Sequence, residues 1–233
     1  VKPDVPTDVS ATANNTGGIA VTWKAPVNTG GIAISDYDVQ SCISTTCTSF
    51  ARASASALLT QTVTGLIKGT AYTFKVAAIN TAGKGLYSLP SEPATPRVTP
   101  GAVSKIAGTP GDDKVDLSWI APTDNGGSSI TSYSVAFSSD AGSTWSQDQS
   151  TNTNSLSVTG LSGGTDYLFR VAANNAAGRG PDATSSAIRT NPFACVPTRT
   201  TSGLNVVMTF SRVGTCAWTV PNAVTSLDSL VVG

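Results

Sequence analysis

Hydrophobic and polar residues alternate along several short stretches of this chain, and no stretch has the spacing of an amphipathic helix. Val115, Leu117 and Trp119, for example, are separated by Asp116 and Ser118. Since successive side chains of a strand point to opposite faces, this alternation predicts strands with one buried face. Glycine-rich turn clusters separate the alternating stretches, as they do in β-sandwiches. The clearest predicted strands are residues 19–23, 72–78, 115–119 and 167–174.

The same motifs occur twice, about 95 residues apart. Residues 23–26 (Trp-Lys-Ala-Pro) return as residues 119–122 (Trp-Ile-Ala-Pro), and Tyr72 returns as Tyr167. A repeat of this length is a whole small domain, since solenoid units span only roughly 20 to 50 residues. We therefore predict two domains and a shorter third segment, at residues 1–96, 97–191 and 192–233.

The repeated motif resembles the fibronectin type III repeat, in the form common in bacterial secreted proteins. Each copy contains Trp-x-Ala-Pro, Gly-Gly, Ile-x-x-Tyr-x-Val, Gly-Leu and Gly-Thr-x-Tyr-x-Phe-x-Val-Ala-Ala-x-Asn-x-Ala-Gly-x-Gly in this order. The resemblance implies an all-β fold of two tandem immunoglobulin-like sandwiches, each with seven strands in two sheets. It also implies a tyrosine corner, in which a phenol hydroxyl bonds to the preceding backbone. The structural core residues that it implies are Trp23, Tyr37, Leu66, Tyr72, Trp119, Tyr133, Leu161 and Tyr167.

The third segment has a different pattern. Strands are predicted at residues 206–210, 215–221 and 227–233, but about 42 residues rarely build a hydrophobic core alone. The sequence Gly-Thr-x-x-Trp-Thr-Val-Pro, followed by Leu-Val-Val-Gly, is similar to the start of bacterial glycine-rich surface domains. We therefore expect a β-rich partial domain that is cut short.

The join between the two copies is rich in proline, with Pro93, Pro96 and Pro100 in a short stretch. Proline-rich linkers are extended and semi-rigid. This composition predicts an elongated arrangement of the two domains with restricted bending.

Charge excludes two classes of partner. Charged residues make up 12% of the chain, and fourteen basic residues balance fourteen acidic ones. Nucleic acids and anionic membranes attract clustered Lys and Arg, so neither is an expected partner. No apolar stretch reaches the roughly 18 residues of a membrane span, and we expect no membrane insertion. The abundance of Ser, Thr, Asn and Gly instead suits an extracellular protein, secreted or on the cell surface.

Four cysteines permit two disulfides, which form in oxidising compartments. Cys42 and Cys47 bracket a short predicted hairpin loop, and Cys195 and Cys216 make a second local pair. The alternative is free thiols in a reducing compartment. Because the chain has no His and no Cys-x-x-Cys pair, we expect no zinc site, and nothing indicates a cofactor.

Candidate catalytic groups are few. Without His, a Ser or Cys nucleophile lacks its usual general base. Paired carboxylates can hydrolyse glycosides, and the candidates are Asp36 with Asp38 and Asp112 with Asp113. Asp36 and Asp38 flank Tyr37 on a predicted strand, so both should face solvent. Asp112 and Asp113 lie in a predicted turn, where we expect them to accept local backbone hydrogen bonds. We therefore predict no catalytic residue and no enzyme in this segment.

Phe50 and Trp145 occupy equivalent positions in the two copies, after the predicted hairpin loop. Such aromatic residues either form a sugar-stacking platform or cover the edge of a sandwich. The function that we expect is a non-catalytic extracellular spacer in a larger bacterial protein, with the neighbouring domains of the same polypeptide as partners. One alternative is an adhesion module that binds a glycan or a host protein. Another is the accessory region of a secreted polysaccharide hydrolase whose catalytic domain lies elsewhere.

Overall fold

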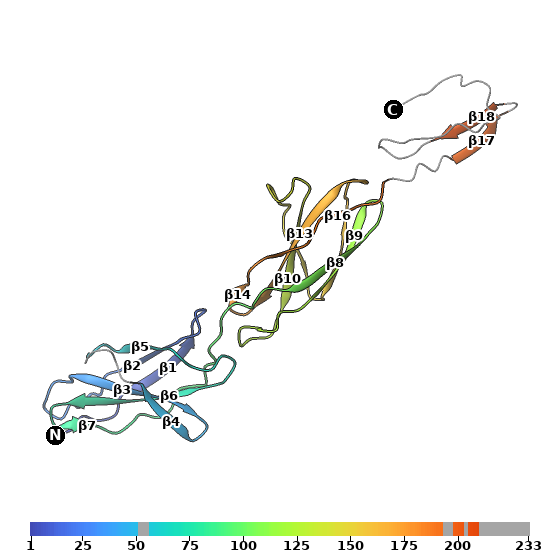
Figure 1. Cartoon of the computed structure of the whole chain (residues 1–233). Helices are drawn as coiled ribbons and strands as arrows, with labels where there is room; N and C mark the ends of the chain where they lie inside the picture. Colours follow the sequence, from blue (N-terminus) through green and yellow to red (C-terminus); the bar gives the residue numbers. More distant parts are fainter. Residues whose placement is uncertain (51–55, 193–197, 203–204, 210–233) are drawn as a thin grey trace.

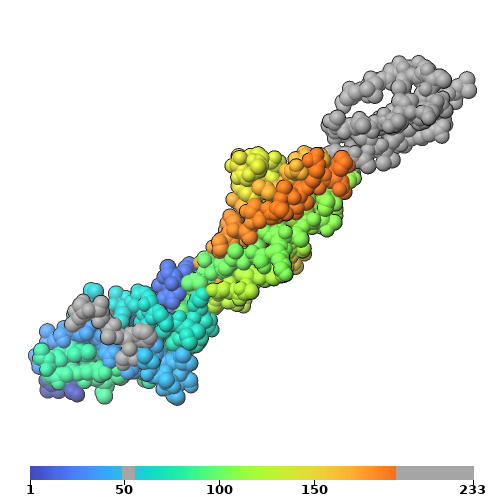
Figure 2. Space-filling model, in the orientation of Figure 1, coloured from blue at the N-terminus to red at the C-terminus, as the bar shows by residue number. Residues whose placement is uncertain are grey.

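The computed structural model describes residues 1–50, 56–192, 198–202 and 205–209. Within these residues all the secondary-structure elements are β-strands. The strands build two sandwiches joined end to end (Figure 1). The predicted fold class, tandem β-sandwiches without helices, is confirmed. The two sandwiches follow one long axis, so the described molecule is elongated (Figure 2).

The first sandwich contains a three-stranded sheet in the order β1-β2-β5 and a four-stranded sheet in the order β4-β3-β6-β7. All the strand pairs in it are antiparallel. The seven strands implied by the family resemblance are therefore present. Their bounds are β1 Thr7–Ala13, β2 Ile19–Lys24, β3 Asp36–Ile43, β4 Thr46–Phe50, β5 Thr60–Val63, β6 Thr73–Asn80 and β7 Gly83–Lys84.

The second sandwich repeats this plan with the sheets β12-β9-β8 and β11-β10-β13-β14, and two further short strands, β15 and β16, also pair with β13. A separate hairpin, β17 with β18, follows. The strands predicted at 215–221 and 227–233 lie outside the described residues. The bounds are β8 Ser104–Pro110, β9 Lys114–Ile120, β10 Ser132–Ser138, β11 Gln149–Thr151, β12 Ser155–Thr159, β13 Asp166–Asn175, β14 Gly178–Arg179, β15 Ala183–Thr184, β16 Ile188–Arg189, β17 Thr198–Ser202 and β18 Asn205–Thr209.

Each sandwich has its own hydrophobic core around a tryptophan and a tyrosine in edge-to-face contact. The ring centroids lie 5.2 Å apart for Trp23 and Tyr37, and 5.3 Å apart for Trp119 and Tyr133. Such pairs contribute beyond the area that they bury. The other implied core residues also lie in these two cores. Tyr72, Leu161 and Tyr167 are buried members of the clusters, and Leu66 is partly buried and packs against the first.

A tyrosine corner is present in both copies. The phenol oxygen of Tyr72 accepts the N–H of Ile67 at 3.1 Å, and that of Tyr167 accepts the N–H of Ser162 at 2.9 Å. The rest of each ring is buried in the core. One side chain thus ties the loop before β6 or β13 to the sandwich interior.

In each sandwich the final segment of chain is hydrogen bonded to the long strand β6 or β13, through serine side chains as well as backbone groups. Ser88 donates its N–H to the carbonyl of Val76 at 2.9 Å, while its Oγ accepts the N–H of Val76 at 3.1 Å. Ser91 bonds to β6 in the same way, and Ser185 does so with Phe169 of β13. In each case the serine hydroxyl accepts the strand N–H that a ladder carbonyl would otherwise accept.

We predict that Tyr72→Phe and Tyr167→Phe each lower the free energy of unfolding by about 1 to 3 kcal/mol, because each leaves a partly buried N–H without its acceptor. Urea unfolding of the two variants measures the change. A loss of only a few tenths of a kcal/mol in both would contradict a structural role for the hydroxyls.

Candidate functional site

The two sandwiches meet at a junction built mostly from backbone. Gly17, in the first sandwich, donates its N–H to the carbonyl of Arg97 at 3.1 Å. The next residue, Val98, donates its N–H to the carbonyl of Gly126 at 2.8 Å. Its own carbonyl accepts a hydrogen bond from the Asn175 side chain, also at 2.8 Å. Adjacent residues of the join are therefore bonded to different sandwiches.

Two glycines lie against each other across the junction. Gly69, in the tyrosine-corner loop, lies against Gly127, in the loop between β9 and β10, where a Cβ on Gly127 would lie only 2.5 Å from the nitrogen of Gly69. Beside them, Lys68 Nζ donates to Asp124 Oδ2 at 2.8 Å. This hydrogen bond lowers the pKa of Asp124. Both charged side chains are well exposed, so the pair orients the sandwiches more than it stabilises them.

The join is therefore more constrained than its proline content alone predicts. Ala94 forms an isolated β-bridge with Tyr72, and Val98 forms one with Thr16. Pro93, Pro96 and Pro100 alone predict a semi-rigid linker, because proline restricts the backbone. Hydrogen bonds to both neighbours add a second restriction, which depends on tertiary contacts.

The second sandwich carries four charged side chains on the outer face of its larger sheet, which we call the charged ring: Asp148, Arg170, Arg179 and Asp182. The N···O distances are 3.5 Å for Arg170–Asp148, 3.6 Å for Arg179–Asp148, 2.6 Å for Arg179–Asp182 and 3.9 Å for Arg170–Asp182. Each charge thus has two neighbours of opposite sign, and the four side chains remain 27–39% exposed.

Trp145 lies beside the charged ring. The guanidinium carbon of Arg170 is 4.9 Å from the centroid of the Trp145 ring, a cation–π contact. Within residues 1–50 and 56–192 the indole N–H donates no hydrogen bond, and it is not buried. Trp145 therefore both packs on the sheet and leaves a polar group open to solvent. Its counterpart Phe50 pairs through its backbone with Val39, and its side chain lies outside the described residues.

The hairpin before this aromatic position is closed differently in the two copies. In the first, a disulfide joins Cys42 to Cys47, as the spacing predicts. In the second, Ser138 occupies the position of Cys42, as the strand pairing shows. The other predicted pair, Cys195 and Cys216, lies outside the described residues. A covalent closure in one copy thus corresponds to a polar closure in the other.

The polar closure is organised by Asp140. Its Oδ1 accepts hydrogen bonds from Ser138 Oγ at 2.6 Å and from the N–H of Thr144 at 2.9 Å, and its Oδ2 accepts one from Thr144 Oγ1 at 2.6 Å. The N–H of Gly142 in turn donates to Ser138 Oγ at 2.8 Å. These bonds, that from Ser138 first, lower the pKa of Asp140 from its ordinary 3.8 to about 2. The ionised carboxylate is the form that closes this hairpin.

The prediction that Asp38 faces solvent is wrong. Its side chain is only 15% exposed, and it accepts hydrogen bonds from Tyr87 Oη at 2.5 Å and from Lys84 Nζ at 2.8 Å. Alternation correctly places Asp38 outside the core, but residues after β6 cover that face. The two hydrogen bonds of Lys84, to Asp38 and then to Tyr87, raise its pKa. Asp36 accepts the N–H of Ser56 at 3.1 Å.

The expected role of Asp112 and Asp113 is also wrong. Both lie in the bend between β8 and β9, but neither carboxylate accepts a hydrogen bond within the described part of the chain. The bend is closed instead by the N–H of Gly111, which donates to the carbonyl of Lys114 at 2.8 Å. Because backbone satisfies backbone here, no local donor needs a carboxylate.

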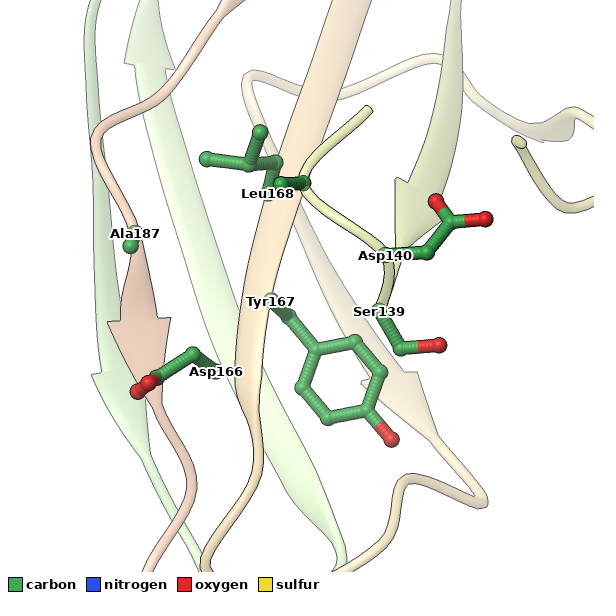
Figure 3. Close-up of a pocket in the computed structure, with 7 residues that line it drawn as sticks. Ser139, Asp140, Asp166, Tyr167, Leu168 and Ala187 are labelled. Atoms are coloured by element: carbon green, nitrogen blue, oxygen red, sulfur yellow. The ribbon is translucent and has the colours of Figure 1, made fainter. Parts of the chain in front are cut away.

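A shallow hollow of about 320 Å³ lies beside β13, between Asp140 and Asp166 (Figure 3). Figure 3 shows the Asp140 carboxylate pointing away from Asp166. Asp166 pairs with Arg189 at 3.2 Å, and the Tyr167 hydroxyl serves the tyrosine corner. These polar groups are therefore already used in holding the fold together.

Within the described ranges, no three Asp, Glu, Cys or His side chains cluster as metal ligands would. The same residues include no helix of the length and apolar character that a bilayer crossing demands.

The fold and the junction define a tandem β-sandwich protein. A family model described as "Fibronectin type III domain" matches residues 4–94 and 101–190, and the chain belongs to this family. A solved structure of titin domains A168–A170 has the same fold, with a TM-score of 0.51 and 19% identity over 82% of this chain and 62% of the titin chain.

Curated relatives include bacterial proteins named for polysaccharide hydrolysis. Endoglucanase B of Cellulomonas fimi is 34% identical over 84% of this chain and 18% of its own length. Exoglucanase B of Cellulomonas fimi is 34% identical over 76% of the chain and 16% of its own length. Chitinase A1 of Niallia circulans is 28% identical over 76% of this chain and 24% of its own length. The chain thus spans less than a quarter of each of these relatives.

Sequence reasoning missed the contact between Lys68 and Asp124 and the composition of the charged ring. Both involve positions at which the copies differ. Asp124 corresponds to Asn28 in the first copy, and Asp182 corresponds to Tyr87. Comparing the copies position by position would have found these residues as candidates, but not their partners.

We predict that replacing both Cys42 and Cys47 with Ser lowers the free energy of unfolding of the first sandwich by about 2 kcal/mol, the loop-closure value for so short a ring. The second sandwich should unfold as before. Urea unfolding followed by NMR, with core methyl signals from each sandwich, separates the two transitions. Equal stability with and without the disulfide would contradict this prediction.

We also predict that the hairpin at Asp140 opens in acid. Since the folded-state pKa is depressed, the stabilisation is complete above the ordinary pKa of 3.8 and is lost as the pH falls through about 2. An NMR titration of the Asp140 carboxyl carbon and the Thr144 amide should have its midpoint near 2. Thr144→Val, which removes one donor, should raise that midpoint. A midpoint at the ordinary value in the unmodified protein would refute the hydrogen-bond network.

Proposed function

We propose that the two sandwiches form a stiff, non-catalytic spacer in a larger extracellular protein that acts on polysaccharides. The observation that carries this proposal is the junction, in which Arg97 and Val98 are bonded to different sandwiches and Gly69 lies against Gly127. Hydrogen bonds from adjacent residues of the join to both sandwiches oppose bending, whereas a flexible linker leaves domains free to move. A stiff rod holds the domains at its two ends a fixed distance apart.

The relatives support the polysaccharide context. Two glucanases and a chitinase contain regions similar to this chain, and each is several times longer than the similar region. Fibronectin type III domains are generally non-catalytic modules. In this proposal a catalytic domain elsewhere in the polypeptide performs hydrolysis, and the spacer sets its distance from another domain or from the cell surface.

Two observations support an extracellular location. The Cys42–Cys47 disulfide is stable in oxidising compartments and rare in the cytosol. The surface relies on Ser, Thr, Asn and Gly, with only 12% charged residues in the whole chain. The partners in this proposal are the neighbouring domains, among them the glycine-rich surface domain that the sequence of residues 192–233 predicts.

We predict that Gly127→Ala loosens the junction and that Gly31→Ala does not. The two glycines are equivalent in the two copies and have φ values of +79° and +75°, so alanine costs each the same backbone strain, about 1 to 2 kcal/mol. Only at Gly127 does the added Cβ meet the other sandwich, since nothing lies within 4 Å of the Cβ position at Gly31. The difference between the variants therefore isolates the contact across the junction.

Small-angle X-ray scattering and spin-label distances between the sandwiches measure this difference. The unmodified protein and Gly31→Ala should give one narrow distance distribution, and Gly127→Ala a broad one. A broad distribution in the unmodified protein would disprove the stiff spacer, whichever enzyme the spacer serves.

A further inference from the structure

The charged ring of the second sandwich is incompletely hydrogen bonded. A guanidinium has five N–H donors, yet within residues 1–50 and 56–192 Arg170 makes a single hydrogen bond, to Asp148 at 3.5 Å. Its Nε is buried without a partner in the described part of the chain, and its Nη1 lies 3.9 Å from Asp182 Oδ2. Three of the four contacts around the ring are 3.5 Å or longer. Donors and acceptors thus face one another with their hydrogen-bonding capacity largely unused.

The equivalent surface of the first sandwich is closed. There Asp38 accepts hydrogen bonds from Lys84 and Tyr87 at 2.8 and 2.5 Å, and Lys84 also donates to Tyr87 at 3.1 Å. Lys84 and Tyr87 correspond to Arg179 and Asp182 of the charged ring. The fold itself is therefore compatible with a compact, self-satisfied cluster at this place, and the open arrangement is particular to the second copy.

Trp145 adds an apolar surface to this open arrangement. Arg170 lies over its ring, and among the described residues its indole N–H, which is not buried, has no hydrogen-bond acceptor. On the outer face of this sheet Ala136 is paired with Arg170 in the strand register, and both Ala136 and the neighbouring Ala172 are fully buried. An aromatic ring thus adjoins a patch of alternating donors and acceptors.

We propose that this surface, Trp145 and the charged ring, binds a neutral polysaccharide. The apolar face of a pyranose ring matches an indole, and each sugar hydroxyl can donate to a carboxylate while it accepts from a guanidinium. A hydroxyl can therefore bridge an Arg–Asp contact that is too long for a good direct bond. Two positive and two negative charges cancel, so a charged ligand gains no net attraction. This binding is separate from the spacer function, because Trp145 and the charged ring share no residue with the hydrogen bonds and glycine contact of the junction.

The test is an NMR titration of the whole chain with three soluble probes: a β-1,4-linked glucose hexamer, a β-1,4-linked N-acetylglucosamine hexamer and an acidic galacturonate hexamer. At least one neutral hexamer should shift the Trp145 indole N–H and the Arg170 side-chain signals in a saturable manner, and the acidic hexamer should not. This measurement needs no mutation, so it does not depend on a variant that folds. Absence of saturable shifts with both neutral hexamers would overturn the proposal. It would do so even if a protein were then found to bind this surface.

Variants then assign the site. Trp145→Ala and Arg170→Lys should each weaken binding of the neutral hexamer by about tenfold, the loss of one stacking contact or one planar donor array. Tyr87→Ala, at the closed surface of the first sandwich, is the matched control and should leave the affinity unchanged. Equal affinity for all the variants would place any binding elsewhere and refute the assignment. The scattering experiment tests the stiff spacer separately, so its outcome does not depend on this result.

Discussion

The Arg97–Val98 pair is the constraint on which the shape of the molecule depends. One residue is hydrogen bonded to the first sandwich and the next is bonded to the second, so no residue remains between them to act as a hinge. Asn175 holds Val98 from inside the second sandwich, and its counterpart Asn80 holds Val1 in the same way in the first. Each copy therefore fixes the segment of chain that enters it, and the geometry of entry is part of the fold.

The two copies show how one scaffold separates folding from surface chemistry. The cores are equivalent, with the Trp23–Tyr37 pair of the first copy matched in the second, and both copies have a tyrosine corner. The hairpin and the outer sheet face differ instead, since a disulfide corresponds to the Asp140 network and a compact cluster corresponds to the charged ring. Substitutions on these outer surfaces do not disturb the packed interior, which tolerates little change in volume.

Much of the fold could be predicted from the sequence, because the residues that fix it are local in pattern and repeated. Trp119 and Tyr167 lie in alternating strands, and the Cys42–Cys47 spacing suits a hairpin. The junction could not be predicted, since Lys68 and Asp124 are far apart in sequence and meet only through the orientation of two domains. The error at Asp38 has a similar origin, because alternation gives the face of a strand but not the side chains that later cover it.

The course of the chain through each sandwich has a mechanical consequence. In the second sandwich the chain enters beside the junction and leaves at the opposite end of the long axis, as Figure 1 shows. A pull on the two ends is then directed along the strands, so the hydrogen bonds that hold the final segment, among them those of Ser185, bear force simultaneously and not one after another. Rupture in this shear geometry requires several bonds to break together, so the sandwich resists extension along this axis.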